Sequence, residues 1–151
     1  MSTTAEPVVA EAWKNFGCGY NCAQSILLAL YKQIEPDEKN ELVPKIAAGF
    51  GGGLGRCGSV CGAVTATIMA VGIKYGSNEV DPEKQAKVYA YSSELFKQFE
   101  KQHGTVYCRD LIKCDLSKPE ELAKARREKV FDKACVNLIK TAITDFLELE
   151  K

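Results

Sequence analysis

Residues 49–75, GFGGGLGRCGSVCGAVTATIMAVGIKY, decide the fold, because a glycine-rich loop here runs directly into an apolar segment. Seven of the chain's twelve glycines lie at positions 49, 51, 52, 53, 55, 58 and 62. From Cys61 to Tyr75 the residues are apolar on all sides, and small ones such as Ala66 and Ala70 let neighbouring backbones approach closely. The stretch therefore predicts a central, buried helix preceded by a glycine-rich loop. The apolar run from Val60 to Ile73 has 14 residues, fewer than the roughly 20 of a membrane span, so we expect no transmembrane segment.

Helical patterns lie on both sides of the central helix. Apolar residues recur at steps of three and four, or lie between clear start and stop signals, over about 7–16, 21–33, 40–49, 81–104 and 131–149, with a further segment over 118–129. No run alternates convincingly with period two, and no linker is long enough to separate two domains. We predict an all-α fold, a single-domain bundle of about six helices.

Three of these helices have recognisable start signals. Asn21 is a good N-cap residue for the second helix, and Asp81 precedes a proline at the first helical position. Ser117 and Glu120 have the spacing of a capping box, which predicts that the segment over 118–129 begins there.

Charge and the N-terminus limit the class of protein. The chain has 151 residues, with 20 Lys and Arg balanced by 20 Asp and Glu, so a general nucleic-acid binder is not expected. Residues 1–7 are polar and acidic, without the basic start and apolar run of a secretory signal. We expect residues 1–7 to form a flexible tail, residues 8–151 to form the domain, and the protein to be cytoplasmic.

The chain contains seven cysteines, at positions 18, 22, 57, 61, 108, 114 and 135. A domain of this length buries about two-thirds of its surface on folding and needs no disulfides for stability. In a reducing compartment, cysteines are more often metal-binding, catalytic or redox-sensing than structural. The cysteines are therefore the candidate functional residues.

Spacing divides six of the cysteines into three close pairs. Cys18/Cys22 and Cys57/Cys61 are both Cys-x3-Cys, which is neither a common zinc-ribbon spacing nor a thioredoxin motif, and Cys108 and Cys114 are also neighbours. Cys22 and Cys61 stand at predicted helix starts, where unpaired N–H groups favour a thiolate. The alternative is that each is a small buried hydrophobic residue, an alternative that is strongest for Cys135 on the inward face of the last helix.

Other chemistries find little support. Gly53, Gly55 and Gly58 match the dinucleotide pattern G-x-G-x-x-G, but that pattern requires a preceding strand, and here a helix is expected. The single histidine, His103, lies at a predicted helix end and is not expected to act as a general base. Any chemistry of this chain is expected to be sulfur chemistry, and no enzymatic reaction or substrate follows from the sequence.

Three segments of the chain resemble one known family. They are GYNCAQS at 19–25, GFGGGLGR at 49–56 and CGAVTA at 61–66, with a Cys-Arg-x-Leu context at 108–111 and a cysteine in the last helix. The chain is similar, from about residue 8 to about 147, to the C_GCAxxC_C_C family of small bacterial and archaeal proteins that are regarded as redox-active. This sequence departs from its relatives at Ala66 and Thr67, where they often have a glycine, and in its extra cysteines, Cys18, Cys57 and Cys114.

The resemblance implies four family cysteines, which here are Cys22, Cys61, Cys108 and Cys135. Related domains are fused to haem-bearing segments of cytochromes, where the four cysteines are suited to an iron–sulfur cluster. We therefore expect a redox or electron-transfer protein with a partner protein and a four-cysteine site for an iron–sulfur cluster or, alternatively, zinc. Backbone N–H groups of the loop are expected to approach its sulfurs; the loop residues are Gly51, Gly52, Gly53, Gly55 and Arg56.

Two further hypotheses stay open at this point. One is a cofactor-free thiol switch in which Cys57/Cys61 or Cys18/Cys22 cycles between dithiol and disulfide. The other is an interaction module without redox activity, assembled through the small residues of the helix over 61–75, for example as a homodimer.

Overall fold

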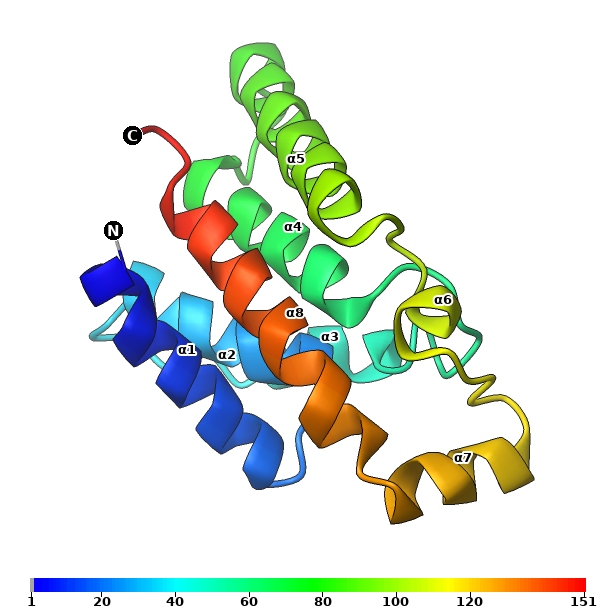
Figure 1. Cartoon of the computed structure of the whole chain (residues 1–151). Coiled ribbons are helices and arrows are strands. Elements are labelled where there is room, and N and C mark those ends of the chain that lie inside the picture. The colour runs from blue at the N-terminus through cyan, green and yellow to red at the C-terminus, as the bar shows by residue number, and fades with distance from the viewer. Residues whose placement is uncertain (1) are drawn as a thin grey trace.

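The computed structural model describes the backbone of residues 2–151 and the side chains from Ala5 onward, and this part of the chain is almost entirely helical (Figure 1). The elements in chain order are α1 (Ser2–Gly17), α2 (Cys22–Ile34), α3 (Leu42–Ala47), a 3-10 turn η1 (Ala48–Phe50), α4 (Gly62–Tyr75), α5 (Pro82–His103), α6 (Cys108–Ile112), α7 (Pro119–Arg127) and α8 (Val130–Leu147). Across residues 2–151 the β structure is limited to an isolated bridge between Val60 and Tyr107. The predicted all-α single domain is confirmed, with eight α-helices within the described residues in place of about six.

The central helix α4 is buried, as its composition predicted. It packs between α2 and α5, while α8 contacts α1, α2 and α4 (Figure 1). Small residues allow this close approach, since Ala63, Ala66 and Ala70 are almost completely inaccessible to solvent. No helix within residues 2–151 has both the length and the apolar character needed to cross a bilayer.

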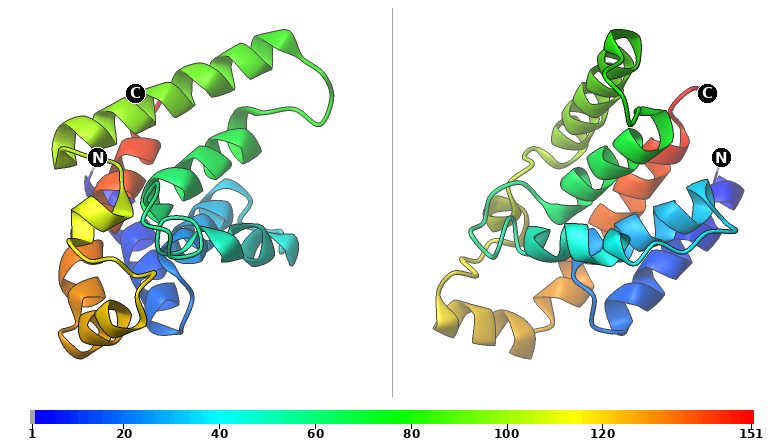
Figure 2. Two further views of the ribbon diagram at one scale, coloured as in Figure 1. Left: turned by 90° about the vertical axis from the view of Figure 1, so that its right-hand side faces the viewer. Right: turned by 180° about the vertical axis from the view of Figure 1, so that it is seen from behind.

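Buried apolar residues form two separate cores. The main core lies among α1, α2, α4, α5 and the second half of α8, and includes Leu30, Val64, Phe99, Ile143 and Phe146. The minor core consists of Cys108, Ile112, Leu116, Ala125 and Cys135. Figure 2 shows the elements of the minor core, α6, α7 and the start of α8, grouped at one end of the molecule. Two of the predicted family cysteines, Cys108 and Cys135, therefore belong to the minor core.

The N-terminal segment differs from the expected flexible tail. Helix α1 begins at Ser2, so residues 2–7 are helical, and Pro7 lies within the helix. Ala5 and Val8 are buried, and Val8 belongs to the main core. This apolar contact accounts for a helix that extends further towards the N-terminus than the sequence pattern predicted.

The segment between α5 and α8 also differs from its prediction. Cys108–Ile112 forms a short helix, α6, that the periodicity did not indicate. The predicted capping box at Ser117 is wrong, because Lys118 is the N-cap of α7 and Pro119 opens the helix. Ser117 instead donates both its backbone N–H and its hydroxyl to the Asp115 carboxylate. A short polar side chain can bond to a local turn as readily as to a helix start.

Candidate functional site

The glycine-rich loop contains a left-handed turn. Five consecutive residues, Gly52 to Arg56, have φ angles of 65°, 71°, 66°, 59° and 67°. Leu54 and Arg56 adopt this conformation although they are not glycines, at a cost of about 1–2 kcal/mol each. The turn is closed by hydrogen bonds from the Gly58 N–H to the Gly52 carbonyl (3.1 Å) and from the Ser59 N–H to the Gly53 carbonyl (2.9 Å). The glycines of the apparent dinucleotide motif thus serve a backbone turn that follows helical structure and precedes α4.

Two glycines leave room for cysteine side chains. A Cβ atom on Gly62, the first residue of α4, would stand 2.5 Å from the Cys22 Sγ atom. A Cβ atom on Gly53 would stand 2.8 Å from the Cys108 Cβ atom and 2.6 Å from backbone atoms of Ser59. Because real side chains do not approach so closely, glycine at these positions allows Cys22 and Cys108 to approach the loop.

The four predicted family cysteines come from four separate segments. Cys22 is the first residue of α2, directly after Asn21, whose side chain accepts a hydrogen bond from the Gln24 N–H (2.8 Å) in a capping box. Cys61 is the N-cap of α4, and Cys108 is the first residue of α6. Cys135 lies in the second turn of α8. Helix starts therefore position three of the four thiols.

Three of these four thiols line one cavity of about 640 Å³, and the fourth is buried close to them. Cys22, Cys108 and Cys135 line the cavity. Cys61 is buried and does not line the cavity. Burial raises the pKa of Cys61, and negative charge on the nearby Cys22, Cys108 or Cys135 raises it further. The structure thus brings together the four cysteines that the family resemblance indicated.

The thiols of this site hold their protons in the metal-free protein. Burial raises the pKa of Cys61 well above its ordinary value of 9.0 and raises that of Cys108 to about 12. Burial also raises the pKa of Cys135, and negative charge on Cys22 and Cys108 adds to the rise. The expectation that helix starts make Cys22 and Cys61 thiolates is therefore wrong for the free protein, because desolvation outweighs the helix dipole.

Backbone N–H groups nevertheless face the Cys22 sulfur. Burial raises the pKa of Cys22, while hydrogen bonding by the backbone of Gly52, Ala23 and Gly62 lowers it in part. These groups come from the glycine loop, from α2 and from α4. They would stabilise negative charge on this sulfur once its proton is displaced.

The remaining predicted residues separate into two groups. Gly51, Gly52, Gly55 and Arg56 line the cavity, whereas Gly53 packs behind its wall. Cys18 and Cys57 are exposed, Cys114 is half-buried beside the minor core, and none of the three is among the residues that line the cavity. All seven cysteines are free thiols, so neither Cys18/Cys22 nor Cys57/Cys61 forms a disulfide in this structure.

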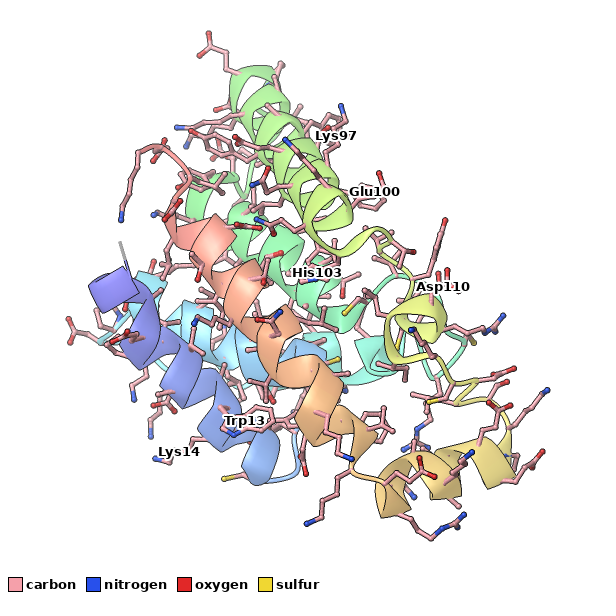
Figure 3. The ribbon with its side chains drawn as sticks, viewed as in Figure 1. Trp13, Lys14, Lys97, Glu100, His103 and Asp110 are labelled. Atoms are coloured by element: carbon pink, nitrogen blue, oxygen red, sulfur yellow. The ribbon has the colours of Figure 1, made fainter. Side chains whose placement is uncertain are left out.

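Sequence reasoning missed the apolar wall of the cavity and one of its charges. The wall contains Phe16, Ile112, Leu116, Leu122 and Phe131, and Arg126 reaches it from α7. Trp13 projects from α1 next to α8 (Figure 3) and stacks on Phe16, with 5.3 Å between the ring centroids. These residues belong to segments that meet only in the folded chain, so no local pattern marked them.

The donor groups of the site are all sulfur. No aspartate, glutamate or histidine lines the cavity among residues 2–151. Within the same residues, no three Cys, His, Asp or Glu side chains stand close enough together to hold a single metal ion. The arrangement therefore offers four thiols around a shared space instead of a closed one-ion site.

A protein-family model matches residues 20–149 of the chain, and its description reads "Putative redox-active protein (C_GCAxxG_C_C)". The family indicated by the sequence is confirmed, with one letter of its pattern corrected from cysteine to glycine. The matched residues include Cys22, Cys61, Cys108 and Cys135, whereas Cys18 lies outside them.

An uncharacterized protein of Archaeoglobus fulgidus is 30% identical to the chain over 98 residues. The similar region covers 60% of this chain and 64% of the relative. No solved structure matches the chain.

Proposed function

Because the chain belongs to the C_GCAxxG_C_C family, we propose that it is an electron-transfer protein in which Cys22, Cys61, Cys108 and Cys135 hold an iron–sulfur cluster. The observation that carries this proposal is that four cysteines from four separate segments lie close together, three of them lining one cavity. A bound cluster would supply one-electron oxidation and reduction.

The chemistry of the donor set fits such a group. Four thiols with raised pKa values are stable in an apolar site only while protonated, because burying a thiolate alone is costly. Positive iron in place of the protons removes that cost, and thiolate is the usual protein ligand of iron–sulfur clusters. The folded protein would thus hold four protected ligands that become thiolates when the metal binds.

The spread of the thiols favours a cluster over zinc. A structural zinc needs four ligands about 2.3 Å from one ion, and no three candidate ligands within residues 2–151 approach a common ion. The cysteines of a cluster bind different iron atoms and can therefore stand further apart.

The glycine loop is the part of the chain suited to tuning the potential. Hydrogen bonds to ligand sulfur stabilise the more negative, reduced state and raise the reduction potential. The backbone of Gly52 and Gly62 hydrogen-bonds to the Cys22 sulfur. The left-handed turn at Gly52 to Arg56 would then contribute to the potential and not only to the fold.

A cofactor-free thiol switch fits less well. In each Cys-x3-Cys pair an exposed thiol, Cys18 or Cys57, is combined with a thiol whose pKa burial raises, Cys22 or Cys61. The buried thiol of each pair, with its raised pKa, is a poor nucleophile for disulfide exchange. The cytoplasmic location, the redox partner and a homodimer stay predictions of the sequence.

Iron and acid-labile sulfide in anaerobically purified protein test the proposal, together with the visible absorption spectrum. We expect both elements in the wild type, their loss in Cys22→Ser and Cys61→Ser, and their retention in the matched controls Cys18→Ser and Cys57→Ser. Circular dichroism of each variant separates loss of the cluster from loss of the fold. A wild-type protein that carries zinc or no metal would contradict the cluster, and equal losses in all four variants would contradict the assignment of its ligands.

A further inference from the structure

The charges that line the thiol cavity are of one sign. Its charged side chains within residues 2–151 are Arg56, from the glycine loop, and Arg126, from α7. A second groove of about 610 Å³, between the ends of α2, α3 and α4, shows the opposite pattern, since Glu35 and Glu38 are its charged residues. The thiol cavity is therefore the one of these two that would attract an anion.

Both guanidinium groups are available for a ligand. Arg56 and Arg126 are exposed, and within residues 2–151 neither side chain forms an ion pair or a hydrogen bond to another residue. Arg109 provides a contrast, because it donates to the Cys57 carbonyl at 3.0 Å and lies 3.9 Å from the Asp115 carboxylate. Arginine is suited to this role because its planar guanidinium binds a carboxylate through two parallel hydrogen bonds.

The rest of the cavity suits an apolar body. Rings and branched side chains face it from four segments of the chain; they are Phe16, Ile112, Leu116, Leu122 and Phe131. Its volume of about 640 Å³ lies within the range of roughly 300–1,000 Å³ that is typical of small-molecule sites. Mostly apolar walls with a few oriented polar groups are the usual composition of such sites.

We propose that this cavity binds a small organic anion, a carboxylate with an apolar body, between Arg56 and Arg126. The carboxylate pairs with these two arginines, which are the charged residues of the cavity lining. The apolar body lies against Phe16, Leu122 and Phe131, next to the thiols. The role of this anion as the electron donor or acceptor rests on the proposed function, whereas its binding does not.

Titration calorimetry with a matched pair of probes tests this inference. The probes are 4-phenylbutanoate and its uncharged amide, 4-phenylbutanamide, which have the same apolar body. Exposed ion pairs are individually weak, so two arginines together should favour the carboxylate on the order of tenfold. We expect Arg56→Gln and Arg126→Gln each to reduce this preference, and the double variant to abolish it.

Arg127→Gln is the control, because Arg127 is the next residue of α7 and does not line the cavity. It should keep the wild-type preference. Trp13 is the chain's single tryptophan and stacks on Phe16, so a change in its emission on binding should place the probe in this cavity. Equal affinity for the two probes, or the same loss in Arg127→Gln as in Arg126→Gln, would overturn the inference.

Iron analysis of the same samples separates this inference from the proposed function. If the protein contains iron and sulfide but shows no preference for the carboxylate, the result would support the cluster and contradict the anion site. A protein without a cluster that retains the arginine-dependent preference would support the anion site and contradict the cluster.

Discussion

The main core and the minor core differ in how tightly they are packed and in the residues that they bury. In the main core, Leu30, Phe99 and Phe146 are at most 2% exposed and pack against the other residues of this core. The minor core has five buried residues, two of which are cysteines, and it borders a cavity of about 640 Å³. Helix α8 belongs to both, with Cys135 in the minor core and Leu138 to Phe146 in the main core. The comparison indicates that the first core holds the fold together and that the second holds thiols around a space.

The largest effect is expected from removing leucine side chains in the two cores. Leu30→Ala in the main core should lower the free energy of unfolding by about 4–5 kcal/mol, because the tightly packed neighbours cannot fill the space that the leucine side chain leaves. Leu116→Ala in the minor core should cost about 2–3 kcal/mol, because this side chain already borders a cavity. Urea denaturation of the metal-free protein measures both values. Equal costs would show that the two cores are equally well packed.

The reactivity of the thiols should distinguish the buried Cys108 of the minor core from the exposed cysteines. In the metal-free protein, burial raises the pKa of Cys108 from 9.0 to about 12, so at about pH 8 its thiolate fraction is about a thousandfold below that of an ordinary thiol. Iodoacetamide labelling, followed by peptide mass spectrometry, should modify the exposed Cys18 and Cys57 much faster than the buried Cys108. Labelling of Cys108 as fast as Cys57 would contradict its burial.

The raised pKa of Cys108 also determines how the stability of the protein changes with pH. The unfolded chain releases the Cys108 proton near pH 9, whereas the folded chain retains it up to about pH 12. The contribution of this thiol to stability is therefore fully present below pH 9 and is lost as the pH rises towards 12. Urea denaturation of the metal-free protein should show that the free energy of unfolding falls as the pH rises between these limits. This fall should be less steep in Cys108→Ala.

The glycine loop beside the thiol cavity allows a comparison of two alanine substitutions. A Cβ atom in Gly53→Ala would meet the backbone of Ser59 at 2.6 Å in a left-handed residue, which predicts a cost of about 2–4 kcal/mol. Gly55→Ala has a similar φ of 59° but meets nothing within 4 Å, so its cost should be limited to strain of about 1 kcal/mol. Thermal unfolding of the two variants distinguishes the loss of stability caused by steric contact from the loss caused by backbone strain. Equal destabilisation would mean that Gly53 is required for its φ angle alone.

Much of the fold could be predicted because it depends on local patterns. Periodic apolar residues located most helices, and the start signals at Asn21 and Asp81 act as predicted. Ser117 and the short helix α6 could not be predicted, because a local turn at Asp115 and contacts with distant segments determine them. The N-terminal helix was missed for a similar reason, since burial of Ala5 and Val8 stabilises it.

The cysteines of the site were predictable, but their electrostatics were not. The family resemblance indicated four cysteines, and the structure brings them together. Their helix-start positions suggested thiolates, yet the net effect on Cys22 and Cys61 is a raised pKa, because desolvation depends on the tertiary packing around each sulfur. Arg126 carried no signal of its own, since it lies in a charged helix that reaches the cavity only after folding.

The most direct test of the four-cysteine site is a crystal structure of anaerobically purified protein with diffraction data collected on both sides of the iron absorption edge. We expect an anomalous difference peak in the cavity, bounded by the sulfurs of Cys22, Cys61, Cys108 and Cys135. A cavity without an iron peak, or iron bound through Cys18, Cys57 or Cys114 in place of any of these four, would contradict this expectation.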